Sequence, residues 1–150
     1  MAAQPADHPV LQVFATIRMI TDEVDDAVAE SLPEGLTVPQ YEVLRLLEFR
    51  GEGLTPAEIA QTLHVPKSGL TNTLQRLEAN GFARVEPCAE DGRKKRVWLT
   101  PAGRDAYVVA LAGIKPKMEH LREAFTIEEF REALPFLKAL RAWFHEKDWA

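Results

Sequence analysis

The 150-residue sequence contains a single cysteine, Cys88, so an internal disulfide framework is excluded. No run of apolar residues approaches the roughly 18 that a membrane-spanning helix needs. The first residues carry neither a basic start nor an apolar core, so they do not resemble a secretory signal. These absences predict a cytoplasmic protein. Its length and its 46% hydrophobic residues predict one domain, 1–150, with enough apolar side chains to bury a core.

The patterns that carry enzyme chemistry are also missing. The sequence shows no nucleophile–base pair, no glycine-rich phosphate loop and no metal-ligand set, so it predicts neither an enzyme nor a cofactor. Glu119, His120 and Glu123 are close enough on one predicted helix to suggest part of a metal site. Without a regularly spaced Cys/His cluster, we interpret them as solvent-exposed polar residues and predict no metal site.

Charge is unevenly distributed along the chain. The whole sequence has a formal net charge of −5, which argues against a protein that coats nucleic acid by charge alone. Residues 54–104 nevertheless hold eight basic and five acidic residues, a net charge of +3 that leaves −8 for the remainder. A polyanion would therefore meet this chain at one place.

Apolar periodicity and capping signals predict a mainly α-helical chain with one β-hairpin. Thr37, Thr55 and Thr126 are each followed three residues later by Gln or Glu, the capping-box pattern of a helix start. Pro116 and Pro135 fall inside predicted helices and predict bends there. We expect helices at about residues 10–31, 37–50, 55–63, 67–80, 100–123 and 126–147, and strands at 82–86 and 96–99.

The predicted helix at 67–80 has two distinct faces. Leu70, Leu74 and Leu77 fall at i, i+4 and i+7 and must face the core. The other face presents polar residues with no acid among them, namely Ser68, Thr71, Asn72, Gln75 and, at its edge, Arg76, and Asn and Gln can make bidentate contacts to adenine. Because an α-helix fits the major groove, we predict DNA contacts from Lys67, Ser68, Thr71, Asn72, Gln75 and Arg76.

The predicted strands flank a basic loop, and the order of elements is that of a winged helix-turn-helix. The loop at 87–95 carries the turn signal Asp91-Gly92. Arg93, Lys94 and Lys95 follow it and could reach the flanking DNA backbone or the minor groove. A polar helix face or a charge run taken alone would be interpreted as solvated surface. The element order and the charge asymmetry together favour DNA binding.

With these features, the chain resembles the multiple antibiotic resistance regulator (MarR) family of bacterial transcription factors. Asp91-x-Arg93 followed by Leu99-Thr100-x-x-Gly103 is the most specific part of the resemblance. The matching segments are LTVPQYEVLRLL at 36–47, LTPAEIAQTL at 54–63, KSGLTNTLQRLEANGFARV at 67–85 and EDGRKKRVWLTPAGR at 90–104.

The resemblance implies a homodimer that binds a pseudo-palindromic double-stranded DNA operator, most simply as a repressor. The winged part would be 36–104, and helices in 8–32 and 105–148 would interlock as the dimerisation region. Arg93 would contact the minor groove, oriented by Asp91. Pro66 stands where relatives often have a capping Ser or Thr, and Asn72 where they often have arginine. We therefore expect a differently capped recognition helix and a different operator sequence.

The resemblance also implies release from the operator by a small-molecule effector. The effector would be a small aromatic or phenolic molecule. Arg18 and Tyr41 are candidate pocket residues, since a phenolic or carboxylate effector would be bound by a cation and an aromatic wall. The alternative is that Arg18 is a surface residue and Tyr41 a core residue. Cys88 beside the loop could be a redox switch if nearby bases lower its pKa, or an inert structural cysteine. A winged helix that binds proteins or ligands without DNA is the rival function.

Overall fold

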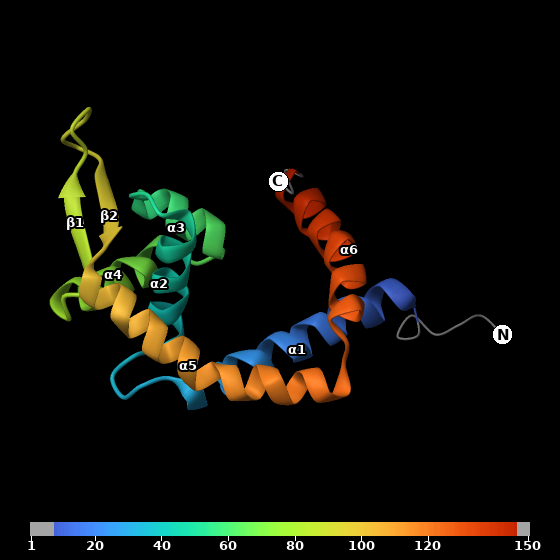
Figure 1. Cartoon of the computed structure of the whole chain (residues 1–150). Coiled ribbons are helices and arrows are strands. Elements are labelled where there is room, and N and C mark those ends of the chain that lie inside the picture. Colours follow the sequence, from blue (N-terminus) through green and yellow to red (C-terminus); the bar gives the residue numbers. More distant parts are fainter. Residues whose placement is uncertain (1–7, 147–150) are drawn as a thin grey trace. The chain divides into compact units, whose positions relative to one another are not determined.

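The computed structural model describes residues 8–146 of the chain, and Figure 1 shows the order of its elements. Two compact units divide the chain within one helix, between Ile114 and Lys115. No helix in residues 8–146 is long and apolar enough to cross a membrane. The elements are α1 (Pro9–Ser31), α2 (Val38–Arg50), α3 (Pro56–Leu63), α4 (Lys67–Ala79), β1 (Ala83–Pro87), β2 (Lys95–Leu99), α5 (Pro101–Ala124) and α6 (Ile127–Glu146).

These elements confirm the predicted fold class, a mainly α-helical chain with one hairpin, and their bounds lie within one or two residues of the prediction. Residues 147 and 148, the last of the predicted dimerisation region, lie outside the described residues. The division into a winged part and flanking dimerisation helices stays a prediction. α5 and α6 continue through Pro116 and Pro135, and the bends predicted at these prolines stay predictions as well.

The three predicted capping boxes are present. The side chain of Thr55 accepts a hydrogen bond from the Glu58 backbone N–H (3.2 Å), and the Glu58 carboxylate accepts one from the Thr55 N–H (2.8 Å). Thr37 and Gln40 form the same reciprocal pair at the start of α2, and Thr126 forms it at the start of α6. α4 differs, because its cap residue is Pro66 and makes no side-chain hydrogen bond. This confirms the expectation that α4 begins without a Ser or Thr cap.

One apolar cluster holds the winged part together, and α2 lies at its centre. Leu44, Ile59, Leu77 and Val97 are each less than 2% exposed, and they come from α2, α3, α4 and β2. A smaller cluster joins Tyr41 of α2 to the first half of α5. The first half of α5 therefore packs with the winged part, in the same compact unit.

The hairpin has a third, short partner that the sequence did not predict. β1 and β2 pair antiparallel, with Val85 opposite Val97. On its other edge, Val97 exchanges both backbone hydrogen bonds with Leu54, at 2.7 and 3.2 Å. Leu54 lies in the connection between α2 and α3, so the hairpin is fixed at its base to the helical core.

Thr100 joins the end of α4, the start of β1 and the start of α5. Its hydroxyl donates to the Gly81 carbonyl (2.6 Å), its backbone N–H donates to the Phe82 carbonyl (3.2 Å), and its side-chain oxygen accepts from the Gly103 N–H (3.0 Å). Gly81 ends α4 with a positive φ of 75°, a conformation that glycine adopts without strain. Gly103 lies so close to the Phe82 carbonyl that no Cβ would fit.

The outer helices bury little within one chain. Among the described residues, neither α1 nor α6 contains a buried one. Both carry large apolar side chains that are about half exposed, which is unusual for helices of a monomer. In α1 these are Val10, Leu11, Met19, Ile20 and Val24, and in α6 they are Phe130, Leu134, Phe136, Leu137, Trp143 and Phe144.

Gly103→Ala is expected to lower the free energy of unfolding by about 1–3 kcal/mol, because the added methyl group overlaps the Phe82 carbonyl. Gly69→Ala is the matched control, since nothing lies within 4 Å of a Cβ built at that position of α4. It should raise the free energy of unfolding by about 0.5–1 kcal/mol through helix propensity. Urea unfolding curves of both variants measure the difference. Equal stabilities of the two variants would contradict the close packing at Gly103.

Candidate nucleic-acid interface

The two faces of α4 lie as the leucine spacing predicted. Leu70, Leu74 and Leu77 are buried in the core of the winged part. The predicted contact residues Lys67, Ser68, Thr71, Asn72, Gln75 and Arg76 are all exposed. The Thr71 hydroxyl donates to the Lys67 carbonyl of its own helix (2.9 Å), so its methyl group and oxygen lone pairs remain for a partner. Packing thus fixes which side chains α4 presents to a ligand.

The start of α4 has backbone donors that no side chain occupies. The first N–H groups of a helix have no acceptor within the helix, and a capping side chain usually accepts from one of them. Pro66 has no such side chain, so these N–H groups remain available at the exposed end that carries Lys67 and Ser68. Free N–H groups and a lysine at a helix N-terminus favour a phosphate group.

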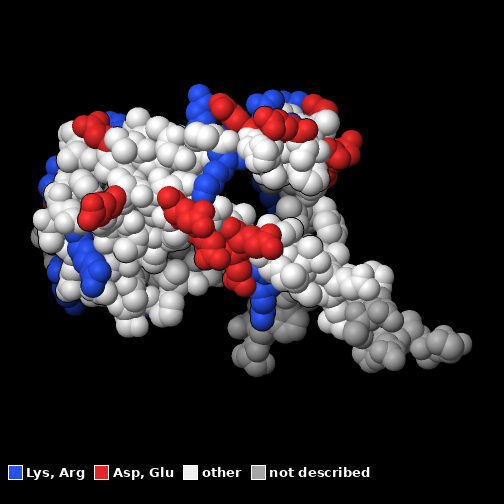
Figure 2. Space-filling view, turned by 90° about the horizontal axis from the view of Figure 1, so that it is seen from below, with Lys and Arg blue, Asp and Glu red and all other residues white. Residues whose placement is uncertain are grey.

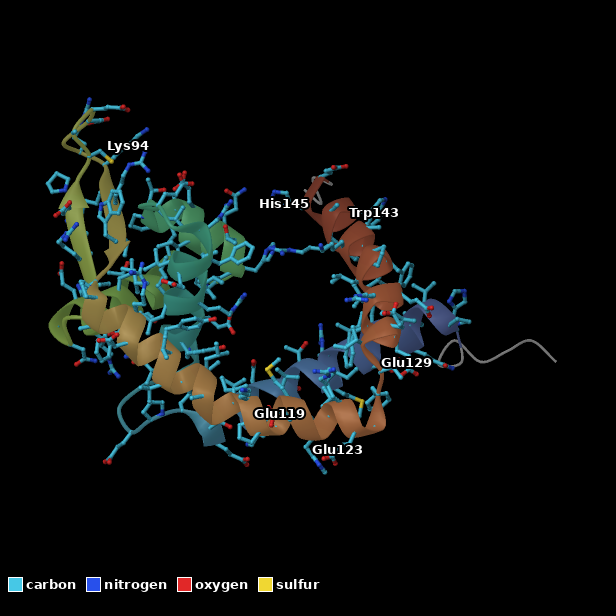
Figure 3. All side chains as sticks on the ribbon, in the orientation of Figure 1. Lys94, Glu119, Glu123, Glu129, Trp143 and His145 are labelled. Atoms are coloured by element: carbon cyan, nitrogen blue, oxygen red, sulfur yellow. The ribbon has the colours of Figure 1, made fainter. Side chains whose placement is uncertain are left out.

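Asp91 organises the tip of the hairpin. Its carboxylate accepts from the Arg93 backbone N–H (3.0 Å), and its carbonyl accepts from the Lys94 N–H (3.0 Å). The Lys94 carbonyl accepts in turn from the Cys88 N–H (2.8 Å), which closes the loop. The Arg93 Nε lies 3.5 Å from the same carboxylate, while its side chain is 94% exposed. The structure therefore brings Asp91 and Arg93 together, with Lys94 at the tip and Lys95 at the start of β2 (Figure 3).

Outside the tip of the hairpin, three of the basic residues in residues 54–104 bind groups of the protein itself. Arg96 donates to the Gly53 carbonyl (2.8 Å), Arg84 pairs with Glu86 (2.5 Å) and Arg104 pairs with Glu48 (2.9 Å). Gly53 itself lies against the Trp98 indole, since a Cβ built at Gly53 would be 2.5 Å from that ring. These contacts fix the base of the hairpin and leave the basic residues of its tip as the exposed charge.

Three of the five acids in residues 54–104 accept hydrogen bonds from the protein's own backbone. Glu58 caps α3, and the Glu78 carboxylate accepts from the Val85 N–H (3.2 Å). Asp91 holds the turn. Because these carboxylates have donors of their own, they oppose an approaching anion less than free acids would. In Figure 2, Lys and Arg side chains mark the left edge of the view, the side on which Figure 1 places the hairpin.

A cavity of about 440 Å³ lies on the other side of α4, between it and α1, α2 and α3. A second cavity, of about 480 Å³, lies near the junction of α4, β1 and α5. Neither Arg18 nor Tyr41 lines either cavity. Arg18 is exposed, and Tyr41 is 6% exposed and stacks on Tyr107 with ring centroids 5.9 Å apart. Burial, Tyr107 and Glu42 raise the pKa of Tyr41. The effector contacts predicted for Arg18 and Tyr41 stay a prediction.

Two further candidates from the sequence lie in different surroundings. Glu119 and Glu123 are exposed on α5, with the His120 ring 3.0 Å from the Glu123 carboxylate. The part of the chain that the structure describes contains no group of three His, Cys, Asp or Glu side chains that could hold a metal ion. Cys88 is half-buried at the end of the hairpin, and its redox role stays a prediction.

With this geometry established, comparison with known proteins assigns the family. A sequence profile of the MarR family matches residues 34–94. The HTH-type transcriptional repressor YetL of Bacillus subtilis is 30% identical over 125 residues, which cover 82% of this chain and 75% of YetL. The chain belongs to the MarR family. We therefore interpret α4 and the hairpin as parts of a protein from this family of transcriptional regulators.

Two further relatives extend the comparison. The HTH-type transcriptional regulator TtmR of Methylorubrum extorquens is 35% identical over 118 residues, or 75% of this MarR-family chain. The match spans only 56% of TtmR. In fold, the chain matches a mutant MarR from Escherichia coli that was crystallised with operator DNA. The TM-score is 0.77 at 24% identity, and the match covers 92% of this chain and 99% of that one.

Asp91→Ala and Glu90→Ala separate two effects on DNA affinity: the hydrogen bonds by which Asp91 holds the tip of the hairpin, and the negative charge that each residue carries. Both variants remove one negative charge beside Arg93, so charge alone predicts tighter binding to DNA for both. Asp91 also closes the turn, whereas Glu90 makes none of its hydrogen bonds. We expect Glu90→Ala to bind duplex DNA slightly tighter and Asp91→Ala to bind it several-fold weaker, in fluorescence anisotropy at fixed salt. Tighter binding by both would remove the organising role of Asp91.

Proposed function

We propose that this MarR-family protein is a cytoplasmic transcriptional regulator that binds double-stranded operator DNA as a homodimer and most simply acts as a repressor. The observation that carries the proposal is a set of exposed side chains on α4, which are polar, include no acid and are fixed in orientation by the buried leucines of the helix: Ser68, Thr71, Asn72, Gln75 and Arg76. Support comes from the repressor YetL and from the operator-bound relative with the same fold.

In the proposed complex, α4 lies in the major groove. Asn72 and Gln75 can hydrogen-bond base edges, and Ser68 and Thr71 can contact bases or phosphates. Lys67 and the free N–H groups at the start of α4 contact the DNA backbone. Asn72 is the position at which we expect the operator sequence to differ from those of relatives with arginine there.

The tip of the hairpin reaches the backbone or minor groove beside this site. Arg93 enters a narrow minor groove, where the negative potential is strongest. Its backbone is held by the Asp91 turn, so less conformational freedom is lost on binding. Lys94 and Lys95 add phosphate contacts.

The homodimer is supported by α1 and α6. Apolar side chains remain half exposed on each of these helices, and a second copy would cover them. A two-fold axis relating the two copies would place two α4 helices on successive half-sites of a pseudo-palindromic operator. An effector that prefers the form with mis-spaced α4 helices would release the operator in proportion to its differential affinity.

Arg93→Ala is expected to weaken operator binding strongly and to lower the slope of log K against log salt by about one unit, as loss of one phosphate-region contact requires. Asn72→Ala should leave the slope nearly unchanged and alter the sequences enriched from a randomised duplex pool. Arg122→Ala, an exposed arginine of α5, is the control. If neither Arg93→Ala nor Asn72→Ala differed from the unmodified chain, α4 and the hairpin would not be the DNA-binding face. A protein without any salt-dependent DNA binding would instead favour a module for protein or ligand binding.

Leu137→Glu is expected to convert the dimer to a monomer, because it introduces a charge on the apolar surface of α6, where Leu137 is 43% exposed. Lys138→Glu is the matched control on the adjacent, polar position and should leave the dimer intact. Sedimentation velocity at micromolar concentration measures the state of each. A monomeric Leu137→Glu protein should also bind a full operator more weakly than the dimer does, because each copy then contacts only one half-site. A dimer in both variants would place the interface elsewhere.

A further inference from the structure

The cavity beneath α4 connects the proposed DNA-reading helix to the rest of the compact unit that contains it. One wall is formed by Pro66, Gly69, Leu70 and Thr73 of α4 and its preceding turn. The opposite wall comes from α1 and α2, and α3 contributes Leu63. Its volume of about 440 Å³ falls within the range of small-molecule sites. An occupant would touch α4 at Gly69, Leu70 and Thr73, whereas the exposed Ser68 and Asn72 do not line the cavity.

We propose that the effector of this protein is a cation with an apolar body, bound in this cavity with its charge beside Asp25 and Glu42. The proposal rests on the proposed function and specifies the chemical class of the effector. The body of the ligand would lie against the apolar lining of Val38, Pro39, Val43, Leu63, Val65 and Leu70. The charge of the lining thus argues for a cationic ligand in place of the phenolic or carboxylate effector for which Arg18 and Tyr41 were candidates.

The sign of the charge comes from the lining residues. Asp25 and Glu42 are its titratable members, and among the described residues no lysine, arginine or histidine lines the cavity. Glu42 pairs with Arg45 (2.8 Å), which reduces its effect. Asp25 has no ion-pair partner among the residues that the structure describes. Asp25 is therefore the free charge that a ligand would meet.

The surroundings of Asp25 reinforce this sign. Partial burial, followed by Glu42, Asp22 and Asp26, raises the pKa of Asp25, so its negative charge is disfavoured by its neighbours. A bound cation would relieve that repulsion, whereas a carboxylate or phenolate would add to it. The second cavity repeats the pattern, since Glu34 and Asp105 line it and no basic residue does within the described part of the chain. Neither cavity offers a cation to an anionic effector.

The cavity can be filled from α4 itself. Nothing lies within 4 Å of a Cβ built at Gly69, although Gly69 is among the lining residues. A larger side chain at this position therefore has room to grow without a backbone clash. This gives a steric test of the cavity that is independent of charge.

Three probes with one aromatic body test the class of ligand: 2-phenylethylammonium, 2-phenylethanol and phenylacetate. Isothermal titration of the full-length protein with each at neutral pH measures affinity. We expect the ammonium ion to bind about fivefold tighter than the alcohol, because that ratio corresponds to the free energy of one partly exposed ion pair. Phenylacetate should bind most weakly. Equal affinity for all three, or the tightest binding for phenylacetate, would overturn the proposal.

Paired variants locate the binding. Asp25→Asn should remove the preference for the ammonium ion over the alcohol, whereas Asp26→Asn, an equal charge change at a residue outside the lining, should retain it. Gly69→Leu should weaken the binding of all three probes, because the leucine side chain would occupy part of the cavity. Gly69→Ala adds only one methyl group and should change the three affinities little. If Asp25→Asn and Gly69→Leu both left ammonium binding unchanged, the ligand would bind elsewhere and the proposal would be wrong.

DNA binding is measured separately, so the two proposals can fail independently. Anisotropy with an operator enriched from a duplex pool reports DNA affinity with and without 2-phenylethylammonium. If DNA binding were normal but did not respond to the ammonium ion, the proposed cationic effector would be wrong and the proposed DNA-binding function would be unaffected. If the ammonium ion bound at Asp25 but the protein showed no salt-dependent DNA affinity, the proposed regulator function would be wrong.

Discussion

Burial of three leucines in α4 is the interaction on which the rest of the structure depends. Leu70, Leu74 and Leu77 pack among residues of α2, α3 and β2, and this fixes the rotation of α4 about its axis. A shift of one residue would turn the helix by about 100° and bring polar side chains into the core. The same packing that stabilises the winged part therefore decides which side chains can meet DNA and which line the cavity on the opposite side.

The apolar side chains of this chain fall into two groups: those buried within one copy and those left exposed on α1 and α6. The winged part satisfies its own core, with Leu44 and Val97 fully enclosed by one copy of the chain. α1 and α6 leave their apolar side chains half exposed, so they gain most of their stabilisation only when another surface covers them. In the proposed homodimer, the stability of these helices and the association of two copies are linked, so the free energy of unfolding would depend on protein concentration.

Local signals predicted most of this fold. Capping threonines with Gln or Glu three residues later placed the starts of α2, α3 and α6, because both partners of each hydrogen bond lie within one turn. The two faces of α4 followed from leucine spacing alone. The pairing of Leu54 with Val97 was missed, because it joins residues 43 positions apart and leaves no periodic mark. The bond from Arg96 to Gly53 was missed for the same reason, and so was the cavity, whose walls come from four separate helices.

The hairpin is attached very differently at its two ends. At its base, the exchange between Leu54 and Val97, the Arg96 hydrogen bond and the Trp98 contact with Gly53 all join it to the core. At its tip, the hydrogen bonds around Asp91 are internal to the loop. The hairpin is therefore fixed to the core at its base and stiffened within the loop at its tip. In the proposed complex with DNA, bending between these two points would let the tip follow grooves of different width while α4 keeps its position in the core.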